Sequence, residues 1–193
     1  KGQGKKTALI YDSPITGNKS KLTYEELRSK VSKFAGALKN QGVGKGDRVI
    51  IYMPMIPEAV IAMLACARIG AIHSVVFGGF ASNELASRID DSKAKLLITA
   101  SCGFEPGRTV EYRPLVDGAL KLAKHKMEKV VFFQRKGNEV SLNAPLEISW
   151  EEALSNAKPT DCIEMESNEF AYILYTSGTT GVPKGIVRDI GGH

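Results

Sequence analysis

Apolar positions along this chain follow two periods, which alternate from one segment to the next. From Leu27 to Leu38 apolar residues recur every three or four positions, the spacing of one helix face. Thr23 precedes this run and Glu26 follows three residues later, a capping-box sequence that predicts a helix start, and Gly42 predicts the end. Four further helices are predicted, at 57–69, 82–92, 114–124 and 150–156.

Serines mark the predicted starts of two of these helices. Ser82 is the expected N-cap of the helix at 82–92, and Ser149 with Glu152 forms a second capping box. The helix at 57–69 is apolar nearly all round and stops at Gly70, which indicates that it lies in the core.

Short apolar and β-branched runs lie between the helices and predict strands at 7–11, 48–52, 72–77, 95–99, 130–133 and 170–174. Strands that alternate with helices indicate an α/β fold, a layered sheet with much parallel pairing and flanking helices. The polar segment 134–148, with Gly137 and Pro145, is predicted to be a surface excursion.

Composition excludes several classes of protein. The chain has 193 residues and a net charge of +5, and its longest apolar run, Ala59 to Ala67, is too short to span a bilayer. The basic stretch at 121–136 lacks regular aromatic interleaving, so we expect a solvated face and no nucleic-acid site. Three unevenly spaced cysteines match no zinc or redox motif, which suggests free thiols in a reducing compartment and predicts no metal site.

The segment from Tyr175 to Gly185 carries the clearest chemistry. It follows a predicted strand, is rich in glycine and hydroxyl residues, and is closed by Lys184. Glycines let backbone N–H groups turn towards an anion, hydroxyls add donors, and the lysine adds a charge, so we predict a polyphosphate site for ATP. The spacing does not match a Walker loop or a dinucleotide fingerprint. A flexible turn is the alternative.

Two other segments follow strands, where open α/β sheets bind ligands. Gly78 and Gly79 join a predicted strand to a predicted helix and allow close approach of a ligand, although a simple tight turn has the same sequence. The segment 101–108, predicted as a loop, ends in Arg108, which could present a planar fork to a phosphate or could form a surface salt bridge. His73 is predicted to be a hydrogen-bonded core residue.

The run from Thr176 to Gly185 fills every fixed position of the Thr-Ser-Gly-Thr-Thr-Gly-x-Pro-Lys-Gly loop and so resembles the adenylate-forming enzymes. These include acyl-CoA synthetases, luciferases and adenylation domains. The segments 22–27, 46–49 and 52–58 resemble short-chain acyl-CoA synthetases. The segments 63–74, 105–112 and 187–189 are most similar to the propionate-CoA ligase branch, the short-chain family member 3 type, with acetyl-CoA synthetase as the near neighbour.

This resemblance implies two half-reactions, in which ATP activates a small carboxylate and CoA then takes the acyl group. It implies a set of residues that hold the ATP phosphates with Mg²⁺: Thr176, Ser177, Gly178, Thr179, Thr180, Gly181 and Lys184, the last also catalytic. It implies that Gly78 and Gly79 line a pantetheine tunnel. Arg108 falls on the last arginine of the family's CoA-binding Arg-Gly-Gly-Arg loop, while Glu105 replaces the first and Pro106 and Gly107 lie between.

The resemblance also leads us to expect part of a large N-terminal AMP-binding domain that stops just after the loop at 175–185, without a C-terminal domain and inactive alone. A cytoplasmic or mitochondrial matrix location is expected, with propionate or acetate as substrate. The alternatives are an adenylating enzyme that loads a carrier protein and a noncatalytic nucleotide-binding module.

Overall fold

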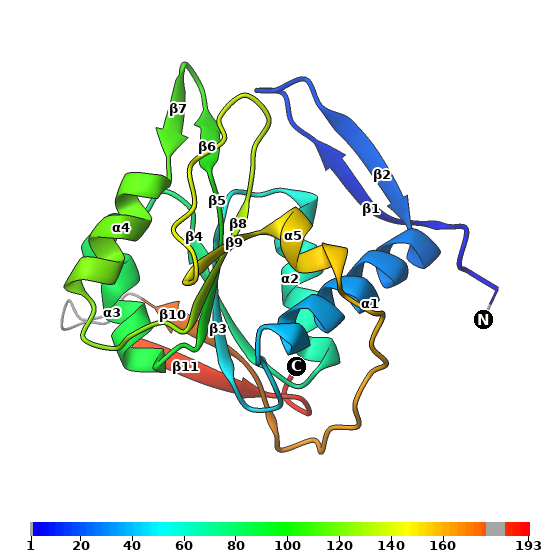
Figure 1. Cartoon of the computed structure of the whole chain (residues 1–193). Helices are drawn as coiled ribbons and strands as arrows, with labels where there is room; N and C mark the ends of the chain where they lie inside the picture. Colours follow the sequence, from blue (N-terminus) through cyan, green and yellow to red (C-terminus); the bar gives the residue numbers. More distant parts are fainter. Residues whose placement is uncertain (1, 177–183) are drawn as a thin grey trace.

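The computed structural model describes residues 2–176 and 184–193, whose largest feature is a seven-stranded sheet (Figure 1). Its strand order is β11-β10-β4-β3-β5-β8-β9. The strands are β3 (Arg48–Met53), β4 (Ile72–Phe77), β5 (Leu96–Ala100), β8 (Lys129–Phe133), β9 (Glu147–Ser149), β10 (Phe170–Thr176) and β11 (Lys184–Asp189). All neighbours pair in parallel except β10 and β11, which confirms the layered α/β fold.

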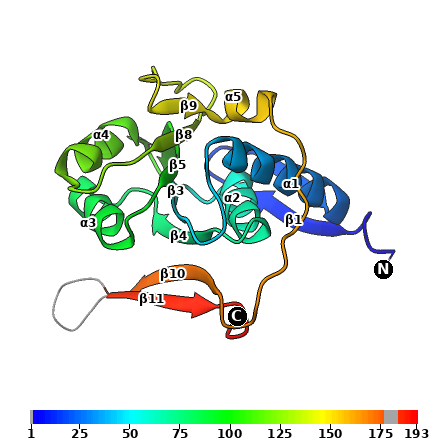
Figure 2. The same cartoon turned by 60° about the horizontal axis from the view of Figure 1, so that its bottom comes forward.

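Helices cover both faces of this sheet, as Figure 2 shows. On one face α1 (Tyr24–Asn40) packs on α2 (Pro57–Arg68) and on α5 (Trp150–Ser155), and on the other α3 (Ser82–Ser92) packs on α4 (Arg113–Leu122). Phe34 of α1 stacks on Trp150 of α5 with 3.6 Å between ring centroids. The strands between these layers, β3 and β5 above all, are almost fully buried and form the core.

Side-chain caps are formed at the starts of α1 and α5, and at α5 only the half of the predicted box in which Ser149 accepts is present. The Thr23 hydroxyl accepts a hydrogen bond from the Glu26 N–H at 3.3 Å while the Glu26 carboxylate accepts from the Thr23 N–H at 2.8 Å, which confirms the predicted box. Ser149 likewise accepts from the Glu152 N–H at 3.0 Å. Ser82 is not an N-cap: Ala81 holds that position, and the Ser82 hydroxyl instead donates to the Leu115 carbonyl at 2.9 Å. The serine therefore joins α3 to α4.

Two hairpins between segments close in sequence contain strands that the pattern of residues did not predict. The predicted loop at 101–108 is part of a hairpin of β6 (Cys102–Glu105) and β7 (Arg108–Glu111), and β1 (Thr7–Asp12) pairs with an unpredicted β2 (Lys19–Thr23).

The polar segment 134–148 is also not wholly a surface excursion, because it ends in β9. Glu147 is only 6% exposed there, and its carboxylate accepts a hydrogen bond from Arg113 at 2.6 Å. Among the helices of the described residues, none is long and apolar enough to cross a bilayer.

Candidate functional site

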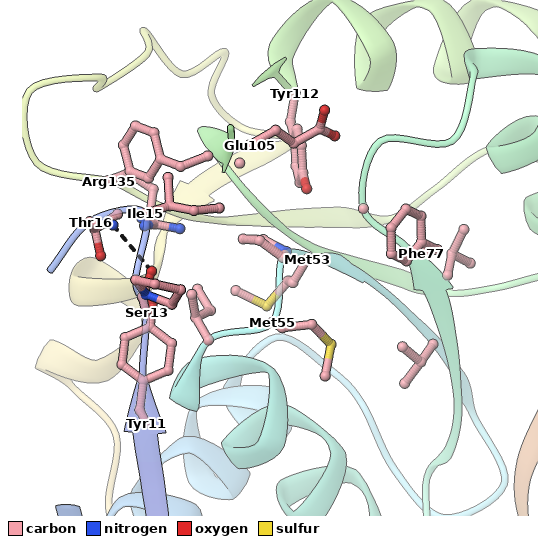
Figure 3. A pocket seen from close by; sticks show the side chains of 18 of the residues that line it. Tyr11, Ser13, Ile15, Thr16, Met53, Met55, Phe77, Glu105, Tyr112 and Arg135 are labelled. Carbon is pink, nitrogen blue, oxygen red and sulfur yellow. Dashed lines mark hydrogen bonds between the residues drawn. The ribbon is translucent and has the colours of Figure 1, made fainter. Parts of the chain in front are cut away.

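A cavity of about 570 Å³ opens where several parallel strands end. Met53 at the end of β3, Phe77 and Gly78 at the end of β4, and Leu174 of β10 all line it. Figure 3 shows Glu105, Tyr112 and Arg135 along its upper rim and Met53 and Met55 below them. The cavity is therefore apolar in its interior, with charged and phenolic groups at one side.

Gly78, the first glycine of the pair after β4, lines the cavity, and its neighbours leave no room for a side chain. A Cβ on Gly78 would collide with the Tyr112 hydroxyl and would lie 2.8 Å from the Met53 carbonyl oxygen. Gly79 has a φ of +107°, a conformation that other residues rarely adopt. Both glycines are thus required by the backbone path, so the predicted close approach is possible at this turn.

The hydroxyl of Tyr52 binds the backbone of the glycine turn. Its hydroxyl accepts a hydrogen bond from the Gly79 N–H at 3.2 Å and donates one to the Phe80 carbonyl at 2.7 Å. Its ring lies 5.0 Å from that of Tyr112. Burial raises the pKa of both phenols, so they stay protonated and act as hydrogen-bonding and packing groups.

The β6–β7 hairpin stands beside this turn and carries the predicted CoA residues. Pro106 and Gly107 form its tip, and Arg108 binds Glu105 across it, with the Arg108 Nη2 atom 2.6 Å and Nε 2.8 Å from Glu105 Oε2. The Arg108 side chain is 71% exposed. Arg108 therefore forms a surface salt bridge, which was the predicted alternative to a phosphate contact. The two charges at the hairpin tip offset each other.

Sequence reasoning did not single out Arg135, which follows β8 and lines the cavity. Its guanidinium carbon lies 4.6 Å from the centroid of the Phe104 ring, and its backbone N–H donates to the Ser101 hydroxyl at 2.8 Å. Its place just after the carboxyl end of a parallel strand was the signal available in the sequence. The basic stretch 121–136 was predicted to be one solvated face, and this prediction hid the position of Arg135.

The ends of the predicted phosphate loop meet across the edge of the sheet. Thr176 is the partner of Lys184 in the antiparallel β10–β11 pair, and both side chains are exposed. The motif's intervening candidates lie outside the described residues: Ser177, Gly178, Thr179, Thr180 and Gly181. The two described ends of the motif, Thr176 and Lys184, therefore lie side by side at the edge of the sheet.

Helix α3 contacts the strand that leads into this loop. The Tyr175 hydroxyl donates to the Asp91 carboxylate at 2.6 Å, and burial together with this bond raises the pKa of Tyr175. The guanidinium of Arg88, a buried residue, lies 5.2 Å from the centroids of both the Tyr175 and Phe80 rings. Arg88 thus lies between the phosphate-loop strand and the residue that follows the glycine pair.

His73 is buried as predicted, at 8% exposure, but its predicted hydrogen bond is not formed at Nδ1 in the described residues. Burial, with a contribution from His193, lowers the pKa of His73 to about 4. Its ring is therefore neutral at pH 7 and lies 5.5 Å from the Tyr172 ring.

The part of the chain that the structure describes holds no group of three or more His, Cys, Asp or Glu residues arranged for a metal ion. Mg²⁺ prefers a nearly octahedral set of oxygen ligands, commonly carboxylates, waters and substrate phosphates. The described residues therefore do not fit a magnesium site made by the protein alone.

Comparisons with known proteins agree with this arrangement of strands and loops. The model of the family described as AMP-binding enzyme matches residues 1–192. The mitochondrial acyl-CoA synthetase short-chain family member 3 of Bos taurus is 57% identical over 193 residues, which cover all of this chain and 28% of that protein. The acetyl-coenzyme A synthetase of Rubrobacter xylanophilus is 48% identical over 194 residues, covering all of this chain and 30% of that protein.

Among solved structures, acetoacetyl-CoA synthetase from Streptomyces lividans superimposes with a TM-score of 0.85 at 28% identity. The match covers 96% of this chain and 28% of that one. The chain thus spans less than a third of the length of these relatives.

Proposed function

The chain belongs to the AMP-binding enzyme family, and from this premise we propose that it serves the ATP-dependent activation of a short-chain carboxylate and its transfer to CoA. The observation that carries the proposal is the complete phosphate motif, whose two ends are paired across the sheet at Thr176 and Lys184. A loop held at one point can present several backbone and hydroxyl donors to a single polyphosphate.

In the first half-reaction, an oxygen of the carboxylate attacks the α-phosphorus of ATP, and the bond from that phosphorus to pyrophosphate breaks. The proposed grip on the β- and γ-phosphates uses Thr176, Ser177, Gly178, Thr179, Thr180, Gly181 and Lys184. The Lys184 ammonium neutralises charge that grows on the leaving pyrophosphate. Positioning and electrostatic stabilisation are the contributions expected of such a loop.

In the second half-reaction, the CoA sulfur attacks the acyl carbon, AMP leaves with the electrons of the broken acyl–oxygen bond, and the thiol proton passes to solvent. Gly78 and Gly79 would border the pantetheine arm, and the open side of the turn is at Gly79, where an added Cβ would have its nearest neighbour, Glu105 Oε1, 3.8 Å away. The hairpin tip, with Glu105, Pro106, Gly107 and Arg108, would face the nucleotide of CoA. The apolar cavity beside it suits a narrow, largely uncharged arm.

We propose propionate as the preferred carboxylate and acetate as the second. The support is the likeness of segments 63–74 and 105–112 to the propionate-CoA ligase branch, together with the 57% identity to a short-chain family member. A reducing compartment, the cytoplasm or mitochondrial matrix, suits its three free cysteines.

Carboxylate-dependent exchange between ATP and labelled pyrophosphate tests the first half-reaction in the whole protein that carries this sequence. Exchange with propionate, and thioester formation when CoA is added, are expected. Exchange without thioester formation on CoA would favour loading of a carrier protein. ATP binding without any exchange would favour a noncatalytic nucleotide-binding module.

A further inference from the structure

Three charged residues line the cavity, and two of them are already paired. Asp12 lies 2.9 Å from Lys19, and Glu105 lies 2.6 Å from Arg108. Arg135 has no ion pair in the part of the chain that the structure describes. Asp12 and Glu105 are offset by Lys19 and Arg108, which do not line the cavity, so Arg135 is the cavity-lining charge without an ion-pair partner among the described residues.

The Arg135 side chain also has hydrogen-bonding capacity to spare. A guanidinium carries five N–H donors, and within residues 2–176 and 184–193 none of them donates a hydrogen bond to another residue. The guanidinium lies over the Phe104 ring, a contact that leaves its charge in place. A planar cation with unused donors, held by an aromatic ring, is suited to bind the oxygens of a phosphate.

Arg135 also lies near the glycine turn, with Tyr112 between them. Burial raises the pKa of Tyr112, and the positive charge of Arg135 opposes that shift, which places the cation within electrostatic range of the phenol. The Tyr112 hydroxyl in turn lies against Gly78. Arg135, Tyr112 and Gly78 therefore border one cavity, as Figure 3 shows for the two labelled side chains.

We propose that Arg135 supplies the positive charge that binds a phosphate group of CoA in this protein, and that Glu105 offsets the charge of Arg108 at the neighbouring hairpin tip. The inference rests on the proposed function. It assigns the recognition of CoA to a residue that is remote in sequence from the hairpin but is held against it by Phe104. The 3′-phosphate and the diphosphate of CoA share the chemistry that Arg135 recognises.

The test is calorimetric titration of the whole protein with CoA and with dephospho-CoA, for the wild type and for Arg135→Gln. Loss of a charge-assisted phosphate contact should weaken CoA binding roughly tenfold or more. If the 3′-phosphate is bound, the variant and the wild type should bind dephospho-CoA alike. If the diphosphate is bound, both ligands should weaken together. Equal CoA affinity of variant and wild type would overturn the proposal.

Matched variants separate charge from structural damage. Lys136→Gln removes an adjacent exposed cation and should leave CoA affinity unchanged, whereas Arg135→Lys, which keeps the charge, should retain part of the affinity. If Lys136→Gln weakens CoA binding as much as Arg135→Gln does, and Arg135→Lys binds like the wild type, a general basic field explains the data and the proposal fails.

Glu105→Gln tests the other half of the proposal. It leaves Arg108 without its carboxylate partner, so in the Arg135→Gln background it should recover several-fold in CoA affinity. No recovery would overturn the offsetting role of Glu105. If the wild type shows pyrophosphate exchange and Arg135→Gln leaves CoA affinity unchanged, this inference alone is refuted. If the wild type shows neither exchange nor CoA binding, the proposed function is refuted as well.

Discussion

Two regions of this molecule that we propose to contact ligands occupy equivalent places, each just after a strand of the same parallel array, yet they are held in different ways. The glycine turn after β4 lies on buried side chains: Tyr52 bonds its backbone twice, and the Tyr112 hydroxyl occupies the space where Gly78 would have a side chain. The ends of the phosphate loop, Thr176 and Lys184, lie on an exposed antiparallel pair at the sheet edge.

The difference concerns how each region keeps its shape. Close packing makes the glycine turn sensitive to added volume, because protein interiors have few voids that could absorb a methyl group. The loop ends are tied to α3 by one hydrogen bond between Tyr175 and Asp91 and by the Arg88 guanidinium. We therefore expect the turn to respond to steric changes and the loop to respond to changes of charge and hydroxyl groups.

The largest expected effect is a loss of folding stability at low pH. It concerns β4 and β10, the two strands that lead to these regions. His73 pairs with Tyr172 in the parallel β4–β10 register, and burial lowers its folded-state pKa to about 4 from 6.5. The unfolded chain binds a proton more readily, so stability is full above pH 6.5 and falls as pH drops towards 4. Through His73, the free energy of unfolding should fall by on the order of 3 kcal/mol.

Urea unfolding between pH 7 and pH 4 measures this effect. A His73→Gln variant, which cannot gain a proton in this range, should show a much flatter dependence than the wild type. Parallel curves for the two proteins would mean that His73 does not set the acid sensitivity.

Lys184→Ala should give the next largest effect, because it removes the point charge at one end of the phosphate loop. Loss of a charge-assisted contact of about 1.5–3 kcal/mol should slow adenylate formation more than tenfold. Carboxylate-dependent pyrophosphate exchange is the measurement. Since Lys184 is exposed, the urea midpoint should stay near that of the wild type, and an unchanged exchange rate would remove Lys184 from the reaction.

Gly78→Ala tests the packed region with the smallest side chain available. The added methyl group would meet the Tyr112 hydroxyl and the Met53 backbone, so a loss of about 1–3 kcal/mol in unfolding free energy is expected. Gly44→Ala is the matched control, because its nearest neighbour would lie 3.8 Å away. Equal stability of the two variants would show that the turn is not tightly packed.

Tyr175→Phe should give the smallest effect. It removes the hydroxyl that donates to Asp91 and leaves the ring beside Arg88, so we expect a loss of about 0.5–1.5 kcal/mol in stability. Pyrophosphate exchange should fall modestly through a higher Michaelis constant for ATP. Asp91→Asn keeps an acceptor oxygen, so it should lose less stability. A greater loss of stability in Asp91→Asn than in Tyr175→Phe would contradict the role of this hydrogen bond.

Local patterns allowed most of the elements to be predicted. The box of Thr23 and Glu26, the apolar runs of β3 and β5, and the glycine stop of α2 depend on residues close in sequence. The N-cap assigned to Ser82 was wrong because its hydroxyl found a partner 33 positions away, at Leu115. The segment 101–108 was predicted as a loop because the hairpin is short and its alternation of residues is weak.

The sequence by itself determined the alternation of strands and helices, the phosphate motif and the two glycines after β4, because these features depend on backbone preferences and spacing within about ten residues. Tertiary structure decided which charges pair between distant segments and which remain available. The Arg113–Glu147 pair and the Arg135–Phe104 contact each join residues about thirty positions apart, and no local periodicity encodes them. Pairing of distant strands brings these partners together, and burial then sets the strength of their interaction.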